Sequence, residues 1–175
     1  MKTIQILDKK FKKSRPAKEI QLKVEQMAGA INNELKDRSV IFVVVLNGAF
    51  MFASDLYKLI KLNSRISFVK AVSYAGTSST GKIKQLIGLN ESLKDTTVVI
   101  VEDIIDTGFT LDSIYKQIKG FEPSDIKIAA LLHKPDSYKF NYKIDYIGFN
   151  IPNDFVVGYG LDYEGFGRNL TSIYT

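Results

Sequence analysis

Two uninterrupted runs that consist almost entirely of β-branched and aliphatic residues constrain the fold of this chain most strongly. They are VIFVVVL, residues 40–46, and TVVIV, residues 97–101. A strand that is apolar at every position, rather than at every second one, is buried on both faces of a sheet. Segments with helical spacing lie before, between and after these runs. This alternation predicts an α/β fold with a central, mostly parallel sheet flanked by helices.

The remaining elements follow from the same spacing rules. Apolar residues at positions 20, 24, 27, 31 and 35 predict an amphipathic helix over 17–36, with Pro16 in its first turn. Further helices are expected at 49–61 and 111–119, and further strands at 66–72, 126–132, 145–149 and 155–159. The polar, glycine-containing segment 76–81 is expected to be a mobile loop. Residues 1–175 show no repeat or linker and are expected to form a single domain.

Composition bounds the location and the partners. No apolar stretch reaches the roughly 18 residues of a membrane helix, and the first twenty residues lack the apolar core of a signal peptide. We therefore expect no membrane association and a cytoplasmic location, which agrees with the absence of cysteine. The net charge of +5 favours acidic partners, and basic residues are densest at Lys9, Lys10, Lys12, Lys13, Arg15 and Lys18. Because a charge run is more often a solvated face than a binding site, we expect no nucleic-acid binding.

The segment after the second apolar run contains acidic residues and a small-residue turn that are candidates for a ligand site. Glu102 and Asp103 follow directly, and burying two adjacent carboxylates without partners would cost several kcal/mol. They are therefore expected at the edge of the sheet or in a paired state. The small-residue turn 106–110 then enters a helix, whose N-terminal N–H groups and positive dipole end suit a phosphate. Acidic groups for sugar hydroxyls or a metal, beside a phosphate cradle, indicate a phosphosugar site.

Polar residues follow the other predicted strands as well. The strand ending at residue 46 leads into Asn47-Gly48, the next into Ser73-Tyr74, and the strand ending at residue 132 into His133-Lys134. Ligands of parallel sheets usually bind beyond the carboxyl ends of the strands. We therefore expect these segments to gather at one edge of the sheet.

Five segments, in the same order along the chain, resemble the type I purine phosphoribosyltransferases, most closely the hypoxanthine or hypoxanthine-guanine type. Residues 99–111, VIVEDIIDTGFTL, are similar to the ribose-phosphate motif of that family, and residues 44–56, VVLNGAFMFASDL, to its pyrophosphate loop. Ser73-Tyr74 resembles the start of its mobile lid. LLHKP, residues 131–135, resembles the strand end with a purine-contacting lysine, and residues 151–170 resemble its base-binding hood.

This resemblance implies a fold and a reaction. The fold would be a twisted, mostly parallel sheet with a small C-terminal hood contributed by residues 150–175. The reaction would be a Mg²⁺-assisted transfer of the phosphoribosyl group from phosphoribosyl pyrophosphate to N9 of a 6-oxopurine, in purine salvage. Hypoxanthine would give IMP, and the choice between hypoxanthine and guanine stays open. A homodimer or homotetramer is also implied.

The resemblance assigns roles to individual residues. Asp106 would be the general base near purine N7. Ribose, phosphate and metal would be bound by Glu102, Asp103, Asp106, Thr107, Gly108, Phe109 and Thr110. Pyrophosphate would contact Asn47, Gly48 and Arg168, and the lid would begin at Ser73 and Tyr74. The purine would be bound by Lys134, Phe155, Val156 and Asp162, with Glu102, Asp103 and Asp162 near the metal.

Two residues depart from the family pattern: Asn47 stands where many members carry lysine, and Phe109 stands at a position that is often polar. Each functional role also has a structural alternative. Glu102 and Asp103 could cap a strand at the surface, Asp106 could cap a helix, and Lys134 could be a surface lysine. Phe155 could be core, and Arg168 could pair with a nearby carboxylate. His133 is expected to pack or to face solvent.

Two functional alternatives also stay open. The chain could act on xanthine, the main rival among 6-oxopurines. It could also be an RNA-binding regulator of pyrimidine synthesis on the same fold, which would show salt-dependent RNA binding.

Overall fold

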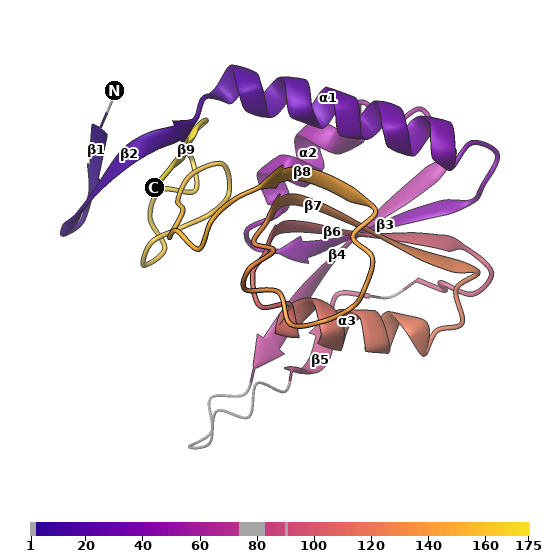
Figure 1. Ribbon diagram of the computed structural model, residues 1–175. Coiled ribbons are helices and arrows are strands. Elements are labelled where there is room, and N and C mark those ends of the chain that lie inside the picture. The colour runs from indigo at the N-terminus through magenta and orange to yellow at the C-terminus, as the bar shows by residue number, and fades with distance from the viewer. Residues whose placement is uncertain (1–2, 74–82, 90) are drawn as a thin grey trace.

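A computed structural model describes residues 3–73, 83–89 and 91–175 (Figure 1). Its large sheet has six strands in the order β5-β4-β3-β6-β7-β8. The apolar runs form the two central strands, β3 (Val40–Leu46) and β6 (Thr97–Ile105). The others are β4 (Ser64–Ser73), β5 (Ile83–Ile87), β7 (Asp125–His133) and β8 (Tyr146–Asn150). Only β5 is antiparallel to its neighbour, so the expected parallel sheet is confirmed.

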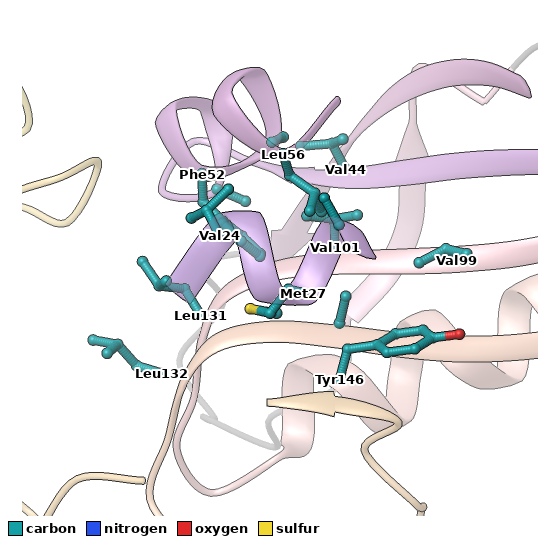
Figure 2. Close-up of a cluster of buried hydrophobic side chains, with 14 of the residues drawn as sticks. Val24, Met27, Val44, Phe52, Leu56, Val99, Val101, Leu131, Leu132 and Tyr146 are labelled. Carbon is teal, nitrogen blue, oxygen red and sulfur yellow. The ribbon is translucent and has the colours of Figure 1, made fainter. Parts of the chain in front are cut away.

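Helices cover both faces of this sheet because alternate side chains of each central strand point to opposite faces. On one face, α1 (Ala17–Glu34) and α2 (Phe50–Lys58) pack on Val44, Val99 and Val101 (Figure 2). On the other face, α3 (Phe109–Lys119) packs on a second cluster that includes Val43 and Ile100. Each fully buried aliphatic side chain contributes about 1.5–3 kcal/mol. Burial on both faces thus holds β3 and β6 in register at the centre of the molecule.

The ends of the helices differ slightly from the expected ones. Helix α1 follows Pro16, whose extended ψ of 148° places it at the N-cap rather than in the first turn. Helix α2 ends at Lys58 rather than near residue 61, and α3 begins at Phe109, two residues earlier than expected. None of the described helices is long and apolar enough to cross a membrane.

A second, smaller sheet lies beside the large one and joins distant parts of the chain. It contains β1 (Thr3–Ile6), β2 (Lys9–Arg15) and β9 (Ile173–Tyr174) in the order β1-β2-β9 (Figure 1). Phe11, Val157 and Tyr174 form its core. The hood expected from residues 150–175 therefore also includes the N-terminal hairpin, which is where five of the six clustered basic residues lie.

The prediction of a strand at residues 155–159 is wrong. Only single bridges form there, between Val157 and Tyr174 and between Gly158 and Leu161. Gly158, Tyr159 and Gly160 have positive φ angles of 99°, 52° and 101°. A left-handed backbone turns the chain instead of extending it. The apolar residues of this segment therefore lie in a loop.

Candidate active site at the carboxyl edge of the sheet

The adjacent carboxylates Glu102 and Asp103 lie within β6, which continues to Ile105 instead of ending at Val101. Glu102 is 5% exposed, so the interpretation of this residue as a surface cap is wrong. Burial, reinforced by the neighbouring charge of Asp103, raises the pKa of Glu102 well above its usual value. Burial also raises the pKa of Asp103 to about 6, against hydrogen bonds from backbone N–H groups and the charge of Arg168. Two desolvated acidic groups at a cavity are typical of a functional site.

The loop after β3 packs directly on the carboxylate of Asp103. A side chain at Gly48 would overlap the carboxylate of Asp103, and a side chain at Gly160 would overlap the Gly48 carbonyl. Backbone of the 47–48 loop therefore touches both β6 and the hood. The Leu46–Asn47 peptide bond is cis, and Asn47 itself is exposed. Close approach of this backbone to Asp103 requires glycine at position 48.

The expected phosphate cradle forms the first turn of α3. Gly108 is the N-cap, with a φ of 87°, and among the described residues no side chain caps the helix. The interpretation of Asp106 as this cap is therefore wrong. The first N–H groups of a helix have no partners within it, so they are free to bind an anion. A cavity of about 330 Å³ runs from the 45–48 loop along residues 102–111 and opens over these groups.

Asp106 instead contacts Lys134, which lies 28 residues away and directly follows β7. The Nζ of Lys134 donates to Oδ2 of Asp106 across 2.6 Å. Lys134 is 7% exposed, so the alternative of an ordinary surface lysine is wrong. The Asp106 side chain is 45% exposed and remains open to a ligand. The pair brings an acceptor and a buried cation to one point of the site.

A second cavity of about 320 Å³ adjoins the first and is lined by all four residues expected to bind purine. Its lining is Gly48, Asp103, Ile104, Asp106, Lys134, Phe155, Val156, Leu161, Asp162 and Arg168. Phe155 is 55% exposed, so the alternative of a core side chain is wrong. Its ring rests on Phe11 at 6.3 Å and on Tyr163 at 5.9 Å, measured between ring centroids. A flat aromatic surface at a cavity wall suits a planar heterocycle.

Arg168 and Asp162 form an ion pair in the hood. The Nη2 of Arg168 lies 2.5 Å from Oδ1 of Asp162, and its Nη1 donates to the carbonyl of Gly160 across 2.7 Å. The other carboxylate oxygen of Asp162 accepts from the backbone N–H of Gly165 across 2.7 Å. The alternative in which Arg168 pairs with a nearby carboxylate is thus confirmed. The same pair also lines the second cavity, so its charges remain at the site.

The donor set fits Mg²⁺ shared with a substrate. Among residues 3–73, 83–89 and 91–175, no three acidic, histidine or cysteine side chains converge on one point. In that part of the chain, no positively charged side chain lowers the pKa of Glu102 against the effects of burial and of Asp103. Mg²⁺ is usually held by one or two carboxylates together with waters and substrate oxygens. Glu102 and Asp103 supply such a pair, and Asp162 lines the adjoining cavity.

The remaining candidates are placed less fully. Ser73 ends β4, while Tyr74 and the segment 76–81 lie outside the described residues. His133 packs in the interior as expected, with its Nδ1 3.0 Å from Oδ1 of Asn150. Since that oxygen only accepts, Nδ1 carries the proton.

One contributor was missed by sequence reasoning. Lys9 Nζ lies 4.5 Å above the Tyr163 ring and 5.7 Å above that of Phe155, which ties the N-terminal hairpin to the exposed aromatic ring. The sequence signal for this hairpin is weak. It consists of two short segments, residues 3–6 and 9–15, separated by the two-residue turn Leu7-Asp8.

Comparisons with known proteins agree with this geometry. The family model described as the phosphoribosyl transferase domain matches residues 16–164. A hypoxanthine-guanine phosphoribosyltransferase of Staphylococcus epidermidis is 40% identical over 158 residues, covering 90% of this chain and 88% of the relative. The hypoxanthine phosphoribosyltransferase of Escherichia coli is 37% identical over 161 residues, covering 90% of both chains. A crystal structure of a hypoxanthine phosphoribosyltransferase from Staphylococcus aureus superimposes with a TM-score of 0.85 at 36% identity, covering 94% of this chain and 90% of that one. The chain therefore belongs to the phosphoribosyl transferase domain family.

Proposed function

We propose that this chain is a purine salvage enzyme that transfers the phosphoribosyl group of phosphoribosyl pyrophosphate to N9 of hypoxanthine or guanine. The observation that carries the proposal is the pair of adjoining cavities. One lies over a helix N-terminus and two acidic groups, the other beside a buried lysine and an exposed aromatic ring, and both include Asp106. A phosphosugar fits the first cavity and a base fits the second. The proteins named above are all transferases, which favours this function over an RNA-binding regulator.

The first cavity would bind the sugar phosphate. Backbone N–H groups of residues 107–110 would donate to the 5′-phosphate at the positive end of α3. Glu102 and Asp103 would accept from the ribose hydroxyls and hold Mg²⁺ through substrate oxygens. The contribution of the bound ion would be to neutralise charge on the leaving pyrophosphate.

The second cavity would recognise the base. An ammonium group has three donors, so Lys134 can keep its bond to Asp106 and also donate to the 6-oxo group. Adenine presents an amino group at that position and would leave the second N–H donor of this buried cation without an acceptor. Phe155 would stack on the ring and Val156 would contact its edge. Asp106 would accept the proton that leaves purine N7 as the new bond forms at N9.

The far end of the site would hold pyrophosphate. Arg168 keeps donors free beyond its bonds to Asp162 and Gly160, because a guanidinium carries five N–H groups. Backbone N–H groups of the Asn47-Gly48 loop would add further donors. A lid starting at Ser73 and Tyr74 would exclude water from the sugar cation that forms during transfer.

A substrate panel tests the function directly. Hypoxanthine, guanine, xanthine and adenine would each be supplied with Mg²⁺ and phosphoribosyl pyrophosphate. We expect turnover with hypoxanthine, and rejection of adenine by a factor on the order of 10² or more, because a buried donor would be left unpaired. Xanthine as the preferred base would support the rival substrate, and RNA binding without turnover of any base would contradict the proposal.

Two variants test the assigned roles. Asp106→Asn should lower kcat by a factor on the order of 10²–10⁴ while phosphoribosyl pyrophosphate still binds. Lys134→Ala should raise the KM for hypoxanthine far more than the KM for phosphoribosyl pyrophosphate. Lys116→Ala is the matched control, because it removes another carboxylate-paired lysine on the exposed side of α3. Equal effects of Lys134→Ala on both substrates would contradict its purine role.

A homodimer or homotetramer and a cytoplasmic location remain predictions. Light scattering coupled to gel filtration would test the first, and cell fractionation would test the second.

A further inference from the structure

An aromatic segment between β7 and β8 lies against the outer side of the expected phosphate loop. We call its rings, together with those they touch on α3, the aromatic wall: Phe109, Tyr115, Tyr138, Phe140 and Tyr142. Phe140 meets Phe109 edge-on at 5.3 Å and lies nearly parallel to Tyr142 at 6.2 Å. Tyr142 in turn packs on Tyr115 at 4.3 Å. The wall thus runs continuously from the loop to the middle of α3.

The wall contacts the loop at its most constrained residue. An added side chain at Gly108 would come within 2.5 Å of the Tyr138 ring and 3.0 Å of the Phe140 ring. Between these two aromatic residues, the backbone N–H of Lys139 donates to the carbonyl of Thr107 across 3.1 Å. The segment therefore closes the side of the loop that faces away from the cavity. The two rings therefore limit how far the backbone at Gly108 can shift toward this segment.

Several contacts fix the wall itself to rigid elements. The hydroxyl of Tyr142 donates to Oδ1 of Asp112 on α3 across 2.7 Å. Burial and this hydrogen bond raise the pKa of Tyr142 to about 12, so the group stays a neutral donor. Tyr138 packs edge-on against His133 at 5.4 Å, and His133 is held by Asn150 of the neighbouring strand. Both a helix and a strand thus determine the position of the rings.

We propose that Tyr138 and Phe140 are positioning residues that hold the 5′-phosphate loop in its binding geometry. Gly108 has a φ of 87°, and glycine permits many other conformations, so the loop's own sequence does not restrict it to this one. Preorganised N–H donors bind an anion better than donors that must first be ordered. The rings lie behind the loop and outside both cavities, so they would act through the loop rather than by touching substrate. This inference rests on the proposed function.

Kinetics with a fragment of the substrate separate this role from simple stabilisation. Phe140→Ala should raise the KM for phosphoribosyl pyrophosphate and the inhibition constant of ribose 5-phosphate by about tenfold, since small misplacements of a binding group are costly. The KM for hypoxanthine and the inhibition constant of pyrophosphate should stay within about threefold, because their subsites lie elsewhere. Tyr138→Phe keeps the ring and should behave like the wild type, and Tyr138→Leu should behave like Phe140→Ala. Phe121→Ala is the matched control, since it truncates an exposed ring just beyond the far end of α3.

Thermal unfolding of every variant shows whether it is folded, and Phe140→Leu replaces Phe140→Ala if the latter is not. A parallel rise in all four constants, or no rise for ribose 5-phosphate, would overturn the proposal. Calorimetric titration of ribose 5-phosphate into wild type and variants needs no turnover. If no base is transferred, the proposed function fails, and this titration still decides the role of the wall.

Discussion

Replacing Asp103 with asparagine should stabilise the folded chain, and the gain should grow as the pH rises. Burial raises the pKa of this carboxyl from 3.8 to about 6 in the folded state. The unfolded chain therefore loses this proton at lower pH than the folded chain does. Between these two pKa values the folded state binds more protons, so raising the pH lowers the free energy of unfolding. The variant has no ionisable group at this position, so its free energy of unfolding does not fall for this reason as the pH rises.

The size of the effect follows from the two pKa values. Above the folded-state pKa, the ionised Asp103 costs about 3 kcal/mol, as an upper limit because the residue is partly exposed. About half of this cost is already present at about pH 5, so the gain of Asp103→Asn should increase by about 1.4 kcal/mol between about pH 5 and pH 8. Loss of the Asp103 charge also relieves Glu102, which adds to the gain with the same sign.

Urea unfolding at both pH values, in a metal-free buffer without substrate, measures the difference. Asp112→Asn is the matched control, because a hydrogen bond from Lys116 lowers the pKa of Asp112 in the folded state. Its ionised form is stabilising above the unfolded-state pKa, so this variant should lose stability at neutral pH, the opposite sign. A gain of Asp103→Asn that is equal at both pH values would refute the reasoning. It would mean that Asp103 titrates alike in the folded and unfolded states.

Three further outcomes are expected. Gly108→Ala should lower the free energy of unfolding by about 1–2 kcal/mol, because alanine is strained in a left-handed backbone. Contact of the new methyl group with Tyr138 should lower it further. Urea unfolding measures the change, and an unchanged midpoint would contradict the described turn. Tyr159→Phe removes a buried hydroxyl that donates to Asp55 across 2.7 Å, so it should cost about 1.5 kcal/mol; a stabilised variant would show that this hydrogen bond does not offset its desolvation. A chelator should abolish phosphoribosyl transfer and added Mg²⁺ should restore it, and a rate that survives chelation would argue against a metal at Glu102 and Asp103.

The large sheet could be predicted from sequence because its signals are local. Burial on both faces makes β3 apolar at every position and β6 apolar over Val98 to Val101, and burial on one face gives α1 its helical spacing. The extension of β6 through Glu102 could not be predicted in this way. A buried carboxylate is unfavourable for folding, so spacing rules end the strand before it rather than inside it. The segments that follow β3, β6 and β7 meet at one edge as expected, because parallel strands end together; Tyr74 lies outside the described residues.

The hood and its contacts depend on residues far apart in sequence. Strand β1 alternates over only four residues, and Phe11 is the only buried residue of β2, so the hairpin gives a weak alternating pattern. Its partner β9 has two residues, too few for a recognisable pattern. The pairing of Lys134 with Asp106 likewise joins residues 28 positions apart. Sequence spacing predicted that both would be near a ligand, but not that they would contact each other.

Pairing of β2 with β9 has a consequence for the order in which the molecule is assembled. Contacts between the hairpin and the hood, such as that of Tyr163 with Asp8, join residues 155 positions apart. During synthesis the hairpin can therefore pair with the hood only after residues 173–174 have been made. Strands β3 and β6 and their helices can pack earlier. Closing such a long loop costs entropy and slows folding. We expect the hood, which would bind the base, to form last, so a nascent chain can form the proposed phosphate loop before the proposed purine pocket is complete.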